Sequence, residues 1–407
     1  MSARRRLASR VVVVGASWPL ETFLRRLFVG LAASGVELLV AGRGGPPRDL
    51  PEGIGWRRLP RLDRMRLLRL AGVVRALLGA WFRAPGATLR LLRSGGRRPS
   101  LDELGRWLPH VGRQGEMLYF PWTAGAAQHE PLLSLDRRPV LLSCRGAQVQ
   151  ISPYDPRRPD YVATLRRSFA RATRVHCVSE AIARRAATLG LEPDKVEVIR
   201  PAVDIDRFAP AESAPPPGPP WRLVTTGSLI WRKGLEDLLV AVARLVEDGH
   251  DVRLELLGDG PERQRVVFTA HDLGLAERVV LRGRVTPDEV VATLRRSHLF
   301  VLASLSEGIA NAALEAMACG LAVVSTRVGG MAEAIEHGVE GLLVPARDPR
   351  ALAEAVGALL DDPARARRLG AAARQRVERA HRLDAQVRAF RDLVGEIACV
   401  DEPADAC

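Results

Sequence analysis

The chain of 407 residues is poor in lysine, since only Lys195 and Lys233 are lysines among 60 basic residues, and the remainder are arginine. Aromatic residues make up only 5% of the sequence. This composition disfavours a β-sandwich and favours helices packed on aliphatic strands. The cysteines form no C-x-x-C pair and have no clustered histidines beside them, so neither a disulfide framework nor a zinc site is predicted, and a reducing cytoplasm is expected. They are Cys144, Cys177, Cys319, Cys399 and Cys407.

Long apolar runs are also missing. The run Val11 to Val14 follows a basic start, and it is far shorter than a secretory segment or a membrane span, so we interpret it as the first buried strand. The formal net charge is +13, which predicts an anionic partner such as a membrane surface, a nucleic acid or a phosphorylated substrate, with a solvated basic surface as the alternative. No nucleic-acid-binding motif is found, so no nucleic-acid partner is expected.

The length and the 47% content of hydrophobic residues predict two domains. The proline-dense segment ESAPPPGPP, 212–220, cannot sustain a helix or a central strand, so the domain boundary is placed there. We therefore expect an N-terminal domain at 1–210, a linker at 211–220 and a C-terminal domain at 221–381. A helix at about 382–400 is a candidate to pack back on the first domain.

Short apolar runs alternate with helical segments along both halves of the chain. In the second half, helices are predicted at Leu235 to Glu247, from Pro261 and from Pro287, with strands such as VRLELLG and HLFVLAS between them. Such βαβ units form parallel sheets. The predicted fold class is α/β, with two doubly wound, Rossmann-like parallel-sheet domains facing across a cleft, and ligands are expected at the carboxyl ends of the strands.

The segment from Arg61 to Arg106 interrupts this alternation, with eleven arginines against three acidic residues. Its apolar residues recur as one helical stripe, which includes Leu67, Leu70, Val74, Leu77 and Trp81. Two interpretations remain open. The helices pack on the N-terminal sheet with their arginines in solvent, or they contact anionic lipid headgroups.

The segment Ser304 to Gly320 directly follows a predicted strand, and it offers a Ser-Glu-Gly turn and then a helix. The free N–H groups at such a helix start favour a phosphate. Glu307 lies in the turn and Glu315 in the helix, so one carboxylate can meet a sugar while the other accepts hydrogen bonds from ribose hydroxyls.

The segment SEGIANAALEAMACGLAVVSTRVGGMAEAI resembles the donor-site signature of retaining GT-B glycosyltransferases of the group 1 (family 4) type, whose E-x7-E motif corresponds to Glu307 and Glu315. The resemblance extends to GSLIWRKGLEDLL, LELLGDGPERQRV and VVLRGRV, and more loosely to RVHCVSEAIARRAATLGLEPDKVEVIRPAVDIDRFAP. PLETFLRRLFVGLAASG is reminiscent of exopolysaccharide and colanic-acid-type members.

This resemblance implies a metal-independent retaining transferase, without a cofactor, that moves a sugar from a nucleotide-diphosphate sugar to a saccharide or lipid-linked acceptor in polysaccharide or glycolipid biosynthesis. The protein is expected in the cytoplasm, either free or attached to the inner face of the cell membrane through residues 61–106. Catalytic roles fall on Glu307, Lys233 and Arg232. Donor-binding roles fall on Gly227, Lys233, Gly283, Arg284, Glu307, Gly308, Ile309, Ala310, Asn311 and Glu315.

The sequence departs from the family pattern in each half. Where relatives carry a G-R-L triplet whose arginine binds the diphosphate together with the lysine, this chain has Gly227, Ser228 and Leu229, and Arg232 is an alternative source of the charge. Where relatives often carry a histidine after a strand of the acceptor domain, this chain has Arg145. Acceptor-side roles are assigned to Gly15 and Arg145, and His129 is either an alternative polar group or a structural residue.

Asp204 and Asp206 form a D-x-D, which holds a metal in another transferase fold, but they follow the hinge-like segment IRPAV and are interpreted as structural. Two other functions remain as alternatives. The chain is a catalytically lapsed nucleotide-sugar-binding or membrane-associated partner protein, or it is a GT-B sugar-nucleotide epimerase, for which no acid and base groups are assigned.

Overall fold

The computed structural model describes residues 10–60, 66–93, 98–135, 138–213 and 215–399, without the side chains of Arg66, Leu67, Ala124 and Cys399. The chain divides into two compact units. The first contains the chain up to Val178, residues 182–199 and the chain from Val387 onward; the second contains residues 179–181 and Arg200 to Gln386. Each unit is described by itself.

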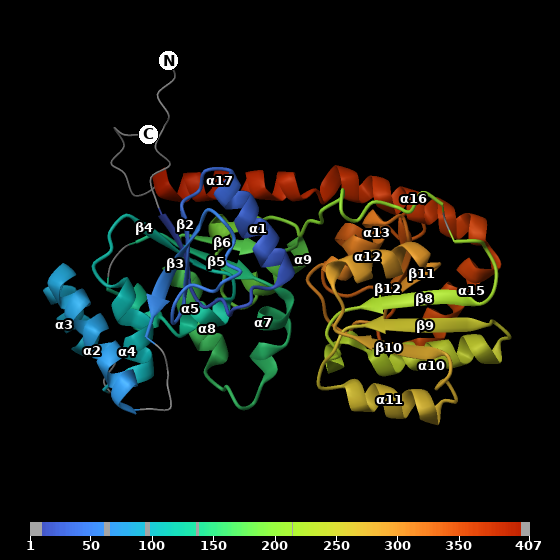
Figure 1. The fold of residues 1–407 in the computed structure, drawn as a ribbon, viewed down its shortest axis with the longest axis horizontal. Helices are drawn as coiled ribbons and strands as arrows, with labels where there is room; N and C mark the ends of the chain where they lie inside the picture. The colour runs from blue at the N-terminus through green and yellow to red at the C-terminus, as the bar shows by residue number, and fades with distance from the viewer. Residues whose placement is uncertain (1–9, 61–65, 94–97, 136–137, 214, 400–407) are drawn as a thin grey trace, which may run out of the picture. The chain divides into compact units, whose positions relative to one another are not determined.

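The first unit is built on a seven-stranded parallel sheet with the order β3-β2-β1-β4-β5-β6-β7 (Figure 1). Strands β4 and β5 are buried along their whole length, as expected for a parallel sheet covered on both faces. The strands are β1 (Arg10–Val13), β2 (Leu38–Arg43), β3 (Ile54–Leu59), β4 (Glu116–Phe120), β5 (Val140–Cys144), β6 (Arg174–Cys177) and β7 (Val196–Val198).

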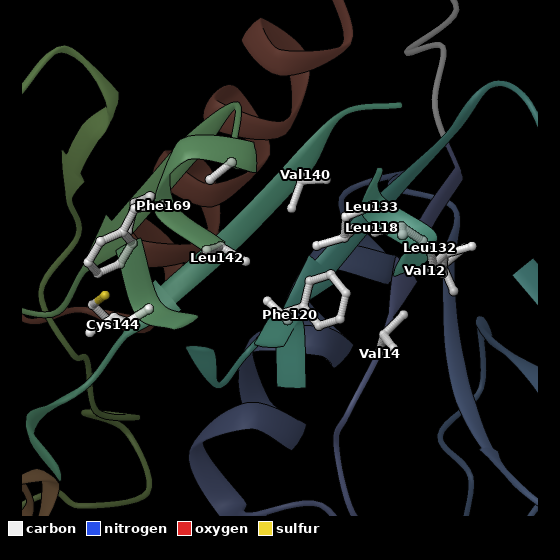
Figure 2. Close-up of a cluster of buried hydrophobic side chains, with 14 of the residues drawn as sticks. Val12, Val14, Leu118, Phe120, Leu132, Leu133, Val140, Leu142, Cys144 and Phe169 are labelled. Atoms are coloured by element: carbon white, nitrogen blue, oxygen red, sulfur yellow. The ribbon is translucent and has the colours of Figure 1, made fainter. Parts of the chain in front are cut away.

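Aliphatic and aromatic side chains from strands and helices form the core of this unit. Figure 2 shows Phe120 of β4 beside Val14, and Phe169 beside Cys144 of β5. The helices are α1 (Thr22–Ala33), α2 (Arg66–Arg83), α3 (Pro85–Arg93), α4 (Leu101–Trp107), α5 (Thr123–Ala127), α6 (Glu130–Leu133), α7 (Gly146–Gln150), α8 (Tyr161–Arg171), α9 (Glu180–Ala187) and α17 (Leu383–Cys399), with 3-10 turns at Leu108–His110, Ser152–Tyr154 and Pro193–Lys195.

The second unit is built on a six-stranded parallel sheet with the order β10-β9-β8-β11-β12-β13. Its strands are β8 (Trp221–Thr226), β9 (Val252–Leu257), β10 (Val279–Gly283), β11 (Leu299–Leu302), β12 (Ala322–Thr326) and β13 (Gly341–Val344). Its helices are α10 (Leu235–Glu247), α11 (Arg263–Asp272), α12 (Pro287–Arg296), α13 (Asn311–Ala318), α14 (Met331–Ala334), α15 (Pro349–Asp361) and α16 (Pro363–Ala380), with a 3-10 turn at Trp231–Lys233.

The α/β class and the two parallel sheets are as predicted. Helix α10 has the predicted bounds, and α12 begins at the predicted Pro287. Helix α11 begins later than predicted, at Arg263, because the N–H of Arg263 closes a turn on the carbonyl of Gly260. His129 lies between the short helices α5 and α6, and Pro131 is in the first turn of α6.

The segment 61–106 forms three helices, α2, α3 and α4, between β3 and β4. Residues 61–65 and 94–97, and with them Arg61 and Arg64, lie outside the described residues. Helix α4 begins with a capping box between Ser100 and Glu103. No helix in the described part of the chain has the length and apolar character needed to cross a membrane.

Candidate functional site

The strand order of the second sheet reverses between β8 and β11, because β8 leads outward through β9 and β10 while β11 leads outward through β12 and β13. Ligands of open parallel sheets bind at the carboxyl edge beside such a switch point. The two loops that leave this edge are 227–234 after β8 and 303–310 after β11. Both loops carry residues that the sequence predicts for the donor site.

Lys233 and Glu307 meet at this switch point. The Nζ atom of Lys233 donates a hydrogen bond of 2.5 Å to Oε1 of Glu307, and the side chains are only 14% and 8% exposed. The hydroxyl of Ser304, which is fully buried, donates to the same oxygen at 2.8 Å. Arg232 is more distant, with Nη1 at 4.0 Å from Oε2 of Glu307. A lysine ammonium has three N–H donors, so Lys233 can contact a second anion while it stays paired with Glu307.

Gly234 allows Lys233 to approach Glu307. It adopts a left-handed conformation with φ of 59° between the Trp231–Lys233 turn and α10. A Cβ atom here would lie 2.1 Å from the carbonyl oxygen of Ala303, at the end of β11. The backbone of the two loops is also joined directly, since the N–H of Leu305 donates to the carbonyl of Arg232 at 2.7 Å. Only glycine allows the loop that carries Lys233 to approach β11 this closely.

Glycines line the neighbouring strand ends. The carbonyl of Gly227, after β8, would be 1.8 Å from a Cβ on Gly258, after β9, and Gly258 in turn donates to the carbonyl of Gly283 in β10 at 2.8 Å. A Cβ atom on Gly260 would lie 2.4 Å from the carbonyl oxygen of Leu229. This carboxyl edge therefore presents main-chain groups with few side chains over them. We name it the glycine edge.

The predicted helix after the Glu307 turn is α13, and it begins at Asn311, one of the predicted donor-binding residues. The Oδ1 atom of Asn311 is buried and has no hydrogen-bond partner among the described residues. The backbone of Gly308 is engaged, because its carbonyl accepts the N–H of Gly330 at 2.5 Å. Glu315 lies one turn into the helix and is half-buried. An unpaired buried amide oxygen at the start of α13 is a polar group that a ligand can satisfy.

In the first unit, the order of the sheet reverses between β1 and β4. Gly15, after β1, has φ of 78° and would place a Cβ atom 3.3 Å from the α-carbon of Gly125. Arg145 follows β5, and its guanidinium carbon lies 4.5 Å from the ring centre of Phe23 and 5.5 Å from that of Trp122. Its Nε atom donates to the carbonyl of Pro121 at 3.3 Å. Aromatic rings and a backbone carbonyl thus hold a cation at the carboxyl edge of this sheet.

A chain of buried hydrogen bonds leads from Arg145 into the core of the first unit. Nε2 of His176 lies 2.8 Å from the carbonyl of Ile199, which can only accept, so the proton is on Nε2 and Nδ1 accepts from Ser143 at 2.8 Å. Ser143 then accepts from the hydroxyl of Tyr119 at 2.9 Å, and the Tyr119 oxygen is left to accept from Arg145. Burial and the charge of Arg145 lower the pKa of His176 to about 3. The histidine is therefore neutral at pH 7, as this chain of donors requires.

Two protein families match the chain at these sites. The model described as glycosyl transferases group 1 matches residues 207–376, and the model described as glycosyltransferase family 4 matches residues 117–207. The chain therefore carries domains of the glycosyltransferase group 1 and family 4 types. The predicted family is therefore confirmed.

Relatives of this glycosyltransferase include the protein named colanic acid biosynthesis glycosyltransferase WcaL of Salmonella typhimurium, which is 33% identical over 199 residues, 47% of this chain and 49% of the relative. A glycogen synthase of Mycobacterium tuberculosis is 34% identical over 183 residues, 45% of this chain and 44% of the relative. The matches thus span about half the length of the curated relatives.

Solved structures share the fold of this glycosyltransferase over almost its whole length. Sucrose-phosphate synthase from Thermosynechococcus elongatus has a TM-score of 0.75 and 20% identity, and the match covers 97% of this chain and 100% of that chain. Anabaena HepE, solved in complex with UDP, has a TM-score of 0.71 and 16% identity, and the match covers 95% and 100%. The predicted GT-B fold is confirmed.

The other predicted residues of the glycosyltransferase differ in their surroundings. Arg284 is exposed beyond β10, and its side chain has no hydrogen-bond or ion-pair partner among the described residues. His129 is buried between Phe120 and His110, with Nδ1 at 2.7 Å from the carbonyl of Gly125. Burial lowers the pKa of His129 to about 4. These surroundings favour the structural interpretation of His129, and its acceptor role stays a prediction.

Sequence reasoning missed Ser304, Gly258 and Gly260 at the carboxyl edge of the second sheet, although the quoted segment LELLGDGPERQRV contains both glycines. It also missed Tyr119, Ser143 and His176, which lie on three neighbouring strands. A cavity of about 430 Å³ lies elsewhere in the second unit, at the amino ends of its strands beside Trp221, Leu299 and Ala322. It is remote in the sheet from the Lys233–Glu307 pair.

Proposed function

We propose that this chain is a retaining glycosyltransferase that moves a sugar from a nucleoside diphosphate sugar to a saccharide or lipid-linked acceptor. The observation that carries the proposal is the Lys233–Glu307 pair at the switch point of the second sheet, beside the glycine edge. A buried lysine at that position can stabilise the leaving group, because a compact ammonium offsets the negative charge that develops on a departing diphosphate.

Different residues around the pair bind different parts of the donor. Lys233 contacts the diphosphate through the N–H groups that do not face Glu307, and the partly buried Arg232 or the exposed Arg284 adds charge in place of the arginine missing at Ser228. Asn311 and the start of α13 receive polar groups of the sugar or phosphate, and Glu315 accepts from ribose hydroxyls.

The chemical step needs no covalent enzyme intermediate. The acceptor hydroxyl oxygen forms a bond to the anomeric carbon on the face from which the diphosphate leaves, the bond between that carbon and the phosphate oxygen breaks, and the leaving phosphate oxygen takes the hydroxyl proton. The contribution of the protein is to position the two substrates and to stabilise the leaving charge.

We propose that transfer needs no divalent metal. In support, Asp204 is used within a turn, where Oδ1 accepts the N–H of Arg207 at 3.1 Å and the carbonyl accepts the N–H of Phe208. The described residues contain no cluster of three or more His, Cys, Asp and Glu side chains of the kind that holds a metal ion. Full activity in chelator is the expected result, and activity that disappears in chelator and returns with magnesium or manganese would contradict it.

On the first unit, we propose that Arg145 and the Gly15 loop face the acceptor. A guanidinium cannot serve as a base at neutral pH, but it binds a phosphate or a sugar hydroxyl well. The aromatic rings of Phe23 and Trp122 and the carbonyl of Pro121 hold it in one orientation, which lowers the entropy cost of binding.

We also propose that α2 attaches the protein to an anionic membrane. Its outer face exposes a row of apolar residues at helical spacing, ending in Trp81 and Phe82, which are 47% and 83% exposed. Of the predicted stripe, Leu77 packs on the core of the first unit, and the side chain of Leu67 lies outside the described residues. The other exposed members are Leu68, Leu70, Val74 and Leu78. Apolar residues flanked by arginine are typical of helices that lie in the membrane interface.

The proposed activity is tested by incubating the protein with UDP-, GDP- and ADP-sugars and saccharide or lipid-linked acceptors, while nucleotide release and product configuration are followed. UDP-glucose is a suitable first donor, because Anabaena HepE was solved in complex with it. Acceptor-dependent release of nucleotide with a retained anomer supports the proposal. Donor binding without release would indicate a lapsed binding protein, and release with an altered sugar would indicate an epimerase.

A further inference from the structure

A second charged site lies in the first unit, at the amino ends of β1 and β4. A cavity of about 420 Å³ is lined by Arg10, Arg83 and Arg113, by Glu37 and Glu116, and by the loop 112–115. Gly15 and Arg145 follow the carboxyl ends of β1 and β5, so this cavity is at the opposite edge of the same sheet. We name it the arginine pocket.

Both carboxylates of the pocket already have arginine partners. Glu116 is buried and forms a two-pronged pair with the buried Arg57, with Nη1 to Oε2 at 2.6 Å. Glu37 pairs with Arg10, whose Nε donates to Oε1 at 2.6 Å. These four residues therefore neutralise one another, and they leave the charges of Arg83 and Arg113 unbalanced.

Arg83 and Arg113 are held by backbone carbonyls. Nε of Arg83 donates to Val111 at 3.0 Å, and Nε of Arg113 donates to Pro109 at 3.0 Å. No carboxylate among the described residues pairs with either guanidinium. Burial lowers the pKa of both side chains, the charge of Arg57 adds to this lowering, and Glu116 offsets only part of it. Two cations are thus fixed side by side without a counter-charge, although an anion would stabilise both.

The backbone keeps these cations together. Gly112 adopts φ of 71°, and a Cβ atom there would lie 2.8 Å from Cβ of Ala84. The loop that carries Arg113 therefore packs tightly against the end of α2, where Arg83 is the last residue. Guanidinium groups with unused N–H donors match the oxygens of a phosphate, and the volume of the pocket leaves room for a substituent on that phosphate.

The place of Arg83 in the chain suggests the source of the phosphate. The residues directly before it, Trp81 and Phe82, belong to the exposed apolar row of α2. We propose that the arginine pocket binds the phosphate of an anionic phospholipid headgroup, while the acyl chains of the same leaflet meet the apolar row. This inference rests on the membrane attachment proposed above and is independent of the donor site.

The test compares two variants with equal loss of charge. Arg83→Gln/Arg113→Gln removes the unbalanced cations of the pocket, and Arg171→Gln/Arg184→Gln removes two exposed arginines of the same unit that have no described partners. Co-sedimentation is measured with vesicles of phosphatidylcholine alone and with added phosphatidic acid. We expect the pocket variant to lose at least about tenfold in partitioning to the anionic vesicles, and the matched variant to lose less than about threefold. Equal losses would overturn the pocket.

A soluble ligand separates the pocket from the membrane. Calorimetry with dihexanoyl phosphatidic acid below its micelle concentration should show binding to the parent and at least tenfold weaker binding to Arg113→Gln, a single change that removes only one bond to a loop carbonyl. Binding of this lipid without vesicle binding would support the pocket and contradict the proposed attachment of α2. Inorganic phosphate that binds as tightly as the lipid would overturn the lipid assignment, and vesicle binding without any lipid binding would overturn the pocket.

Discussion

Lys233 and Glu307 are 74 residues apart in the chain, yet Nζ of Lys233 donates a hydrogen bond of 2.5 Å to Oε1 of Glu307. The contact depends on β8 and β11 being neighbours in the sheet. Because the pair is largely buried, its two members are coupled, and loss of the lysine leaves the Glu307 carboxylate with the hydroxyl of Ser304 at 2.8 Å and the more distant Arg232 at 4.0 Å.

Lys233→Ala is expected to weaken donor binding by about 1.5–3 kcal/mol, the usual range for a hydrogen bond to a charged group. The measurement is calorimetry with the nucleotide sugar that the enzyme accepts. Lys195→Ala is the matched control, since it removes the other lysine of the chain, which contacts backbone carbonyls of the first unit. A folded Lys233→Ala protein with the donor affinity of the parent would refute the donor-site assignment.

The same variant is expected to unfold more easily, because the buried Glu307 loses its nearest cation. Lys233→Met/Glu307→Gln should recover stability while donor affinity stays low, since the uncompensated charge is removed together with the phosphate ligand. Urea unfolding and calorimetry on the same preparations separate these effects. Recovery of donor affinity in the double variant would mean that Lys233 acts only by holding Glu307.

Gly234→Ala is expected to destabilise the second unit and to raise the KM for the donor. Gly274→Ala is the matched control, because Gly274 has a similar φ of 67° with no atom within 4 Å of a Cβ. The control pays only the cost of the left-handed conformation, about 1–2 kcal/mol, whereas Gly234→Ala also places a methyl group against the carbonyl of Ala303. Equal unfolding free energies of the two variants would show that the loops tolerate separation.

Trp81→Ser/Phe82→Ser is expected to reduce vesicle binding, because it removes the most exposed end of the apolar row on α2. Val267→Ser/Phe268→Ser is the control, since it removes a comparably exposed apolar pair from α11 in the second unit. Co-sedimentation of both variants at low and high salt gives the comparison. If the two variants lose binding equally, α2 is not the site of attachment.

The first unit should lose stability in mild acid. The pKa values of His176 and His129 are lowered to about 3 and about 4, whereas an ordinary histidine has 6.5. Below pH 6.5 the unfolded chain takes up protons that the folded chain refuses, so the stability present above that pH falls as the pH falls toward 4, by about 1.4 kcal/mol per pH unit for each histidine. The slope of unfolding free energy between pH 6 and pH 5 measures it, and His129→Phe should lower that slope. An unchanged slope would contradict the buried neutral state.

Much of the second unit follows from sequence, because its apolar runs and its E-x7-E segment are local patterns. The sequence identified Lys233 and Glu307 separately, but it could not predict their hydrogen bond, which requires the pairing of β8 with β11 and the conformation of Gly234. The hydrogen bonds that link Tyr119, Ser143 and His176 could not be predicted for a similar reason, since they depend on the register of three strands. The apolar stripe on α2 was predicted, but its division between the core, where Leu77 packs, and the exposed row was not, because a periodic pattern does not show where the core touches the helix.

The glycine edge limits how this protein can change over evolution or in the laboratory. A side chain at Gly258 or Gly260 would collide with the backbone of the neighbouring loop, and Gly330 is restricted in the same way by the carbonyl of Gly308. Point substitutions at these positions are therefore expected to destabilise the second unit and not simply to change its ligand preference. A library intended to change donor preference should leave these glycines fixed and vary exposed positions nearby, such as Arg284.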